Sequence, residues 1–154
     1  MNTITRSTDP FTARFGIASP RTLQAETAGI SWSEFLERYS PTSGPMRLRE
    51  WSVSPGIAGM RSYDGILDID GRVAAFSTAA TGPIAALTTF LHEAGHGVEI
   101  LAFHQRPVAE GTATFVHCEH DGRRHWAIAI SDSPTDSALR AIIAGANILS
   151  AKGR

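Results

Sequence analysis

The sequence predicts an α+β fold in which two βββα repeats follow a small helical region. An Asp-Gly dipeptide, typical of two-residue hairpin turns, begins at Asp70 and recurs 51 positions later at Asp121. Pro83, which suits the first position of a helix, recurs as Pro134 at the same spacing. Two kinds of local signal repeated at one spacing indicate an internal duplication.

Each repeat is predicted to contain three strands followed by one helix. In the first repeat, apolar patterning predicts strands at about 47–53, 60–69 and 73–78 and a helix at about 84–94. In the second, it predicts strands at 98–103 and 112–120, a strand containing Trp126, Ile128 and Ile130, and a helix containing Leu139, Ile142 and Ile143. The predicted repeats cover about 46–96 and 97–150 of a domain at 46–154.

The N-terminal part is predicted to be a flexible tail at 1–10 and a helical linker-like subdomain at 11–45. One helix is expected in this subdomain, from Trp32 to Arg38 and ending before Pro41. Ser31 is a good N-cap, and Glu34 three positions later completes a capping-box pattern.

Composition favours a folded cytoplasmic domain, and no cofactor is expected. Hydrophobic residues make up 42% of the chain and charged residues 19%, enough apolar material for a core. The net charge of −1 and the lack of a basic run argue against nucleic acid as a partner, and no apolar stretch is long enough to span a membrane. Cys118 is the only cysteine, which fits a reducing compartment.

The pentapeptide His92-Glu93-Ala94-Gly95-His96 matches the H-E-x-x-H pattern of zinc hydrolases. That pattern holds zinc only if both imidazoles project from one continuous helix. Gly95 instead predicts the end of the helix, because glycine readily adopts the left-handed conformation that follows a helix. We therefore expect no metal site, and a zinc hydrolase remains the least favoured alternative.

Several segments, in order and spacing, resemble the C-terminal regulatory domain of 2-isopropylmalate synthase and part of the linker before it. These are Gly82 to Leu87, the helix end at Gly95, Val98 to Leu101, Ala127 to Ser133, Ser137 to Ile142, Asn147, Ser19 to Arg21 and Trp32 to Tyr39. The resemblance implies two βββα units related by a pseudo-twofold axis, forming a homodimer that binds leucine between units. It also implies a stand-alone module, because the family's catalytic barrel, of about 250 residues, is too long for this chain.

A ligand site is predicted where Gly82 and Pro83 begin the first repeat's helix. The backbone N–H groups of Ile84 and Ala85 at such a helix start suit a carboxylate. The full set of expected ligand-binding residues is Gly82, Pro83, Ile84, Ala85, Ile100, Phe103 and Pro107. The expected ligand is a branched-chain amino acid or a related carboxylate, and a partner enzyme regulated in trans is a further expectation.

The sequence departs from the family pattern around this site. Ala80 and Thr81 replace a glycine and an asparagine, and Ala102, Phe103 and Gln105 replace an acid, a phenol and a second acid. Because of these changes, whether leucine itself is the ligand stays an open question at this point. The changes also leave open a pocket recruited for acid–base catalysis, for which the candidate residues are His92, His104 and Arg106. A purely structural dimer is the remaining alternative.

Overall fold

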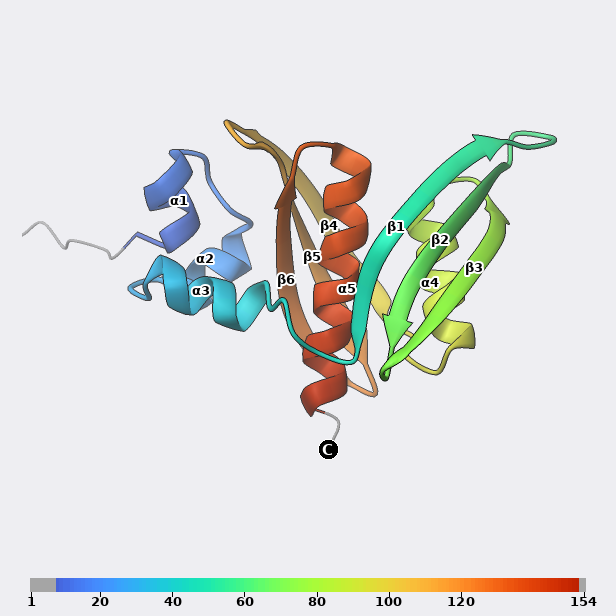
Figure 1. The fold of residues 1–154 in the computed structure, drawn as a ribbon. Coiled ribbons are helices and arrows are strands. Elements are labelled where there is room, and N and C mark those ends of the chain that lie inside the picture. Colours follow the sequence, from blue (N-terminus) through green and yellow to red (C-terminus); the bar gives the residue numbers. More distant parts are fainter. Residues whose placement is uncertain (1–7, 153–154) are drawn as a thin grey trace, which may run out of the picture.

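The computed structural model describes residues 8–152, in which the elements follow the order of two βββα repeats after three short helices (Figure 1). The first repeat consists of β1 (Met46–Pro55), β2 (Arg61–Ile69), β3 (Arg72–Ala80) and α4 (Pro83–Glu93). The second consists of β4 (Glu99–Val108), β5 (Gly111–His120), β6 (Arg123–Ser131) and α5 (Pro134–Lys152). Each repeat forms its own antiparallel three-stranded sheet, so the predicted α+β fold and duplication are confirmed.

The two repeats share local details beyond their element order. Asp70 and Asp121 both have positive φ, 52° and 51°, and each is followed by a glycine with positive φ. These are the backbone conformations of a type I′ turn, which Asp-Gly favours. Both first strands also carry a β-bulge, with Arg49 and Leu101 as the unpaired residues. The bulges were not evident from the sequence, and they support the same duplication.

Helix α5 lies between the two sheets, with β1 on one side and its own sheet on the other (Figure 1). The main core joins both repeats through this helix: Ile142 and Leu149 of α5 belong to one buried cluster with Leu67 of β2 and Leu87 of α4. Cys118 on β5 belongs to this cluster, and burial raises the pKa of its thiol to about 12. The thiol therefore stays protonated near neutral pH and acts as a core residue.

Three helices cover the outer face of the second sheet, where one was expected. They are α1 (Pro10–Phe15), α2 (Arg21–Thr27) and α3 (Trp32–Tyr39). Their aromatic side chains pack on β5: the rings of Phe11 and Phe115 are 4.8 Å apart and meet edge to face. Of the tail expected at 1–10, residues 1–7 lie outside the described residues, whereas Asp9 and Pro10 are buried at the start of α1.

The start of α3 follows the sequence prediction. Ser31 has an extended backbone, and its hydroxyl accepts a hydrogen bond from the N–H of Glu34 at 3.0 Å. The carboxylate of Glu34 pairs with Arg38 one turn later. An N-cap bond of this kind satisfies one of the N–H groups that a helix start leaves free. The predicted helix ended at Arg38, and the observed one includes Tyr39.

Candidate functional site

The start of α4 leaves backbone N–H groups open. Its N-cap is Gly82, which has an extended backbone and makes no side-chain capping bond, and Pro83 occupies the first helical position. The N–H of Ala86 bonds to the carbonyl of Gly82. The N–H groups of Ile84 and Ala85 come before the first intrahelical bond, so they are available to a ligand. The dipole of the helix adds partial positive charge at this point.

A broad cleft of 700 Å³ lies between this helix start and the beginning of β4. Its walls combine apolar side chains with two hydroxyls and one carboxylate. They are formed by Thr81, Gly82, Ile84, Ala85, Thr88, Val98, Glu99 and Ile100. The hydroxyl of Thr88 donates to the carbonyl of Ile84, so this side chain is held within the helix. The cleft therefore offers N–H donors at one place and an exposed carboxylate, that of Glu99, at another.

The structure brings together most of the residues predicted from the sequence. Gly82, Ile84, Ala85 and Ile100 all line the cleft, and Pro83 lies beside them at the helix start. Phe103 and Pro107 do not line it, because they lie farther along β4.

Four lining residues were not predicted: Thr81, Thr88, Val98 and Glu99. Helical spacing contains a signal for Thr88, which is one turn after Ile84 and so shares its face of the helix. Val98 and Glu99 come immediately before Ile100 in the sequence, but only the tertiary structure brings the start of this strand against α4.

Gln105 has a structural role in place of the acidic residue that the family pattern has there. Its amide nitrogen donates to Thr114 Oγ1 at 3.0 Å and to the carbonyl of Pro134 at 2.8 Å. Thr114 continues the network to the hydroxyl of Ser137 at 2.7 Å. These bonds tie β4 and β5 to the start of α5, and they leave the amide of Gln105 engaged within the protein.

The three residues named for catalysis are dispersed. His92 borders a separate cavity of 430 Å³ at the end of α4. The ring of His104 lies on the outer face of the second sheet, 6.2 Å from the ring of Trp126. Arg106 donates from Nε to the carbonyl of Ala18, before α2. Acid–base catalysis needs its groups within hydrogen-bond reach of one reacting atom. This arrangement does not favour the enzyme alternative.

The H-E-x-x-H pentapeptide spans a helix end, as its glycine predicted. Helix α4 ends at Glu93, and Gly95 follows with a φ of 85°. The N–H of His96 bonds to the carbonyl of Leu91, and that of Gly95 to His92, which is the Schellman arrangement. His96 has therefore left the helix. Within residues 8–152, no group of three or more His, Cys, Asp or Glu side chains is placed to hold a metal ion.

The start of α5, which corresponds to the α4 site, is filled by the protein itself. Ser133 stands where the first repeat has Gly82, and its hydroxyl accepts a hydrogen bond from the N–H of Asp136. Asp136 stands where the first repeat has Ala85, and its carboxylate accepts from the indole of Trp51 at 3.0 Å. The two helix starts of the duplicated fold are thus chemically different. The start of α4 has no side-chain cap and no acidic residue in its first turn.

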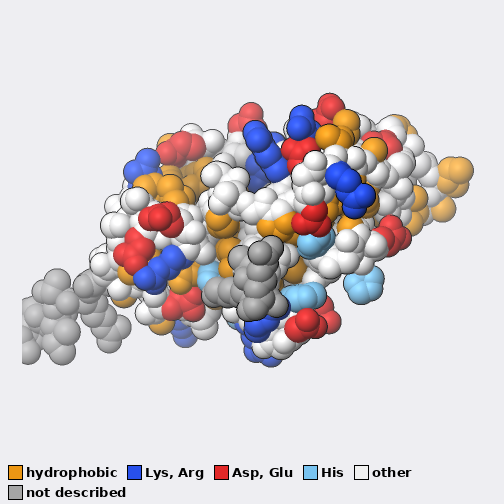
Figure 2. Space-filling model, turned by 60° about the horizontal axis from the view of Figure 1, so that its bottom comes forward, with side chains coloured by type: hydrophobic (Ala, Val, Ile, Leu, Met, Phe, Trp, Pro, Cys, Tyr) orange, Lys and Arg blue, Asp and Glu red, His pale blue; other side chains and the backbone are white. Residues whose placement is uncertain are grey.

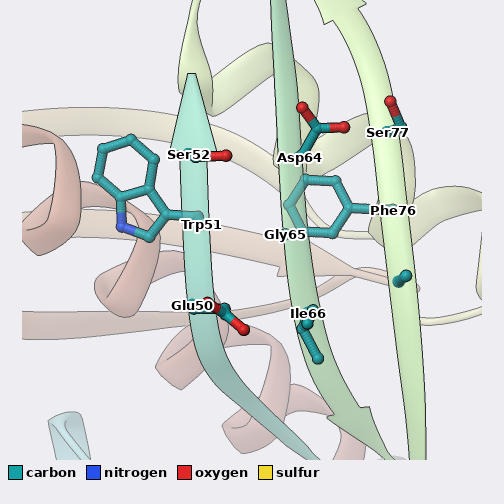
Figure 3. A pocket seen from close by; sticks show the side chains of 9 residues that line it. Glu50, Trp51, Ser52, Asp64, Gly65, Ile66, Phe76 and Ser77 are labelled. Carbon is teal, nitrogen blue, oxygen red and sulfur yellow. The ribbon is translucent and has the colours of Figure 1, made fainter. Parts of the chain in front are cut away.

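A further cavity, of 430 Å³, lies on the first sheet around Gly65 (Figure 3). Glu50, Ser52, Asp64 and Ser77 border it. The ring of Phe76 lies over the glycine, where a Cβ would come within 2.2 Å of the ring.

On the face in Figure 2, acidic and basic groups are interspersed. No helix in the described residues is long and apolar enough to cross a membrane.

Comparison with known proteins agrees with the fold. The model of the LeuA allosteric (dimerisation) domain matches residues 32–150. The chain belongs to this family. The LeuA-type match includes α3 and both βββα repeats, while α1 and α2 precede it. The family resemblance expected from the sequence is therefore confirmed.

Relatives of this LeuA-type domain include 2-isopropylmalate synthases of three bacteria. The protein from Arthrobacter sp. is 28% identical over 82% of this chain. That from Mycobacterium ulcerans is 28% identical over 88%, and that from Rhodospirillum rubrum is 26% identical over 90%. The matched regions make up 24%, 28% and 29% of those proteins, so the chain spans about a quarter of the relatives' length.

Proposed function

We propose that this domain is a dimeric regulatory module that binds a small aliphatic amino acid in the α4–β4 cleft. The observation that carries the proposal is the difference between the two helix starts. Ser133 and Asp136 fill the start of α5, whereas Gly82 and Ala85 leave the start of α4 open. A duplicated fold with one filled and one open helix start provides one carboxylate-binding position per chain.

The cleft chemistry favours an amino acid over other carboxylates. The ligand carboxylate would accept from the N–H groups of Ile84 and Ala85. The exposed carboxylate of Glu99 would pair with the ligand ammonium, and Ile84, Val98 and Ile100 offer apolar contact to an aliphatic side chain. A 2-oxo acid of the same shape lacks the cation that Glu99 would bind. Leucine, isoleucine and valine are therefore the first candidates.

We expect that a variant made to resemble the second repeat, Gly82→Ser with Ala85→Asp, binds leucine at least about tenfold more weakly than the parent protein. The new hydroxyl would cap the open N–H, as Ser133 does, and the new carboxylate would repel the ligand. No described atom lies within 4 Å of a Cβ added at Gly82, and the glycine backbone is extended, so serine fits without strain. Isothermal titration calorimetry measures the affinity.

The control is Thr89→Asp, which adds the same charge to an exposed position of α4 that does not line the cleft. It should bind leucine like the parent protein. The double variant should also keep or slightly raise its melting temperature, because a serine cap and an acidic first turn stabilise a helix. If the parent shows no heat with leucine, isoleucine or valine, or if the double variant binds as the parent does, the proposed site is wrong.

Dimerisation is the second part of the proposal. The family description includes it, and β4 is an edge strand that exposes 42% of Leu101 and 36% of Phe103. Exposed apolar side chains on an unpaired edge favour association with a second chain. We expect light scattering to give twice the chain mass of 16.5 kDa, and Leu101→Glu with Phe103→Glu to shift it toward the monomer. A parent protein that is monomeric at all concentrations would contradict this part.

The relatives of this chain also suggest which kind of catalytic domain such a module regulates. Those proteins are named 2-isopropylmalate synthases, and this chain matches about a quarter of their length. We infer that ligand binding here changes the activity of a catalytic domain of that kind, whether on the same chain or on another.

A further inference from the structure

A second cavity large enough for a small ligand lies between β1, α5 and β6. Its volume is 540 Å³, within the usual range of small-molecule sites. In Figure 1, β1 and β6 run on opposite sides of α5, and the segment after α3 passes below them. The lining residues are Ser40, Pro41, Thr42, Met46, Arg47, Leu48, Ala129, Ile130, Arg140, Ile143, Ala144 and Asn147.

The same strand position borders both this cavity and the α4–β4 cleft. Val98 precedes β4, and Glu99 and Ile100 begin it beside α4. The matching residues of the first repeat, Met46–Leu48, begin β1 beside α5. The bulges after Leu48 and Ile100 confirm this alignment. The duplication therefore placed two strand starts against two helices, and each pair borders a cavity.

The charge of the central residue is reversed between the two cavities. Glu99 is an acid, and its counterpart Arg47 is an exposed base that makes no ion pair within residues 8–152. Arg140 adds a second guanidinium. Its Nε donates to Asp136 at 2.7 Å, which leaves its terminal nitrogens as further donors. No acidic side chain lines this cavity, so its charged groups are both basic.

The remaining walls suit the body of a small organic acid. Ser40 and Thr42 bring hydroxyl-bearing side chains from the segment after α3, and Ile143 and Ala144 form an apolar side on α5. Asn147 is held in place by its two bonds to the backbone of Met46. Guanidinium groups bind carboxylates through charge-assisted hydrogen bonds, which are stronger than neutral ones.

We propose that the cavity between β1 and α5 binds a small organic carboxylate that has no amino group. Arg47 and Arg140 would bind the carboxylate, and the apolar side of α5 would contact a short aliphatic chain. An α-ammonium would lie near two guanidinium groups, and the carboxylate beside them, that of Asp136, is already bonded to Arg140 and Trp51, so an amino acid is disfavoured there. The site is independent of the amino-acid site proposed above, because different residues line it: they come from β1, β6 and α5 in place of α4 and β4.

The test compares two probes that differ only at the α-carbon, 4-methyl-2-oxopentanoate and leucine. Calorimetry should show saturable binding of the oxo acid to the parent protein. Arg47→Gln should weaken it by about tenfold or more, because a charge-assisted bond is lost. Arg49→Gln is the matched control. It removes the same charge two residues away, where Arg49 pairs with Asp68 and does not line the cavity, and it should leave oxo-acid affinity unchanged.

A third variant distinguishes the two sites. Glu99→Gln should leave oxo-acid binding unchanged, whereas Arg47→Gln should leave leucine binding unchanged. The inference is overturned if the oxo acid does not bind at millimolar concentration, or if Arg47→Gln and Arg49→Gln have equal effects. It is also overturned if the oxo acid is displaced by leucine, since both would then share the α4–β4 cleft. If leucine fails to bind while the oxo acid binds through Arg47, the proposed function fails and this site stands.

Discussion

Replacing Asn147 with alanine is expected to lower the free energy of unfolding by about 2–4 kcal/mol. The side chain is only 4% exposed and makes two hydrogen bonds to one residue of β1. Its Oδ1 accepts from the N–H of Met46 at 2.9 Å, and its Nδ2 donates to the carbonyl of Met46 at 2.8 Å. Alanine would leave both buried backbone groups without a partner, and each carries a desolvation penalty. Urea denaturation followed by circular dichroism measures the loss.

Ser150→Ala is the control for this prediction. Ser150 lies about one turn later on α5 and makes a single side-chain bond, at 3.3 Å to His96. Its removal should lower stability by less than about 1 kcal/mol, as is usual for one partly exposed hydrogen bond. Equal losses for Asn147→Ala and Ser150→Ala would show that the two backbone bonds do not hold β1 against α5.

Replacing Gly65 with valine is expected to destabilise the first repeat by about 2–3 kcal/mol or more. Gly65 pairs with Phe76 across β2 and β3, and a Cβ at this glycine would lie 2.2 Å from the phenyl ring. Phe76 is itself confined, because its ring stacks on Phe90 with centroids 4.8 Å apart. The ring cannot move aside without breaking that contact. The midpoint of chemical denaturation should fall accordingly.

The second repeat suggests the compensating change. The pair that corresponds to Gly65 and Phe76 is Val116 and Ala127, which has the large and small residues exchanged. The double variant Gly65→Val with Phe76→Ala should therefore be more stable than the sum of the single effects predicts, with a coupling of about 1–3 kcal/mol. The single variant Phe76→Ala completes the double-mutant cycle. Strictly additive losses would mean that the two side chains do not share one packing space.

Local chemistry made most of the domain predictable. Asp-Gly turns at Asp70 and Asp121 need two residues with positive φ, and few other dipeptides accept that conformation. Gly95 ends α4 for a similar reason, so the separation of His92 from His96 followed from the sequence. Helices α1 and α2 were missed because they have only six and seven residues. Helices that short depend on tertiary packing for their stability.

The candidate site was only partly predictable. Gly82, Ile84 and Ala85 are neighbours in the chain, and their grouping follows from one helix start. Ile100 also lines the cleft, whereas Phe103 and Pro107 lie outside it. Which part of a strand faces a helix depends on how sheet and helix are packed, and strand periodicity specifies only the alternation of faces.

The sequence by itself determined the duplication, the turns and the helix ends, because each depends on the backbone preferences of a few adjacent residues. Only the tertiary structure decided that the two helix starts differ in how their free backbone groups are covered. Ser133 and Trp51 act on the start of α5 from the adjacent loop and from a distant strand, whereas no side chain of the described residues caps the start of α4. Whether a helix N-terminus is filled or open depends on contacts made across the fold, since its free N–H groups accept a partner from any element that approaches.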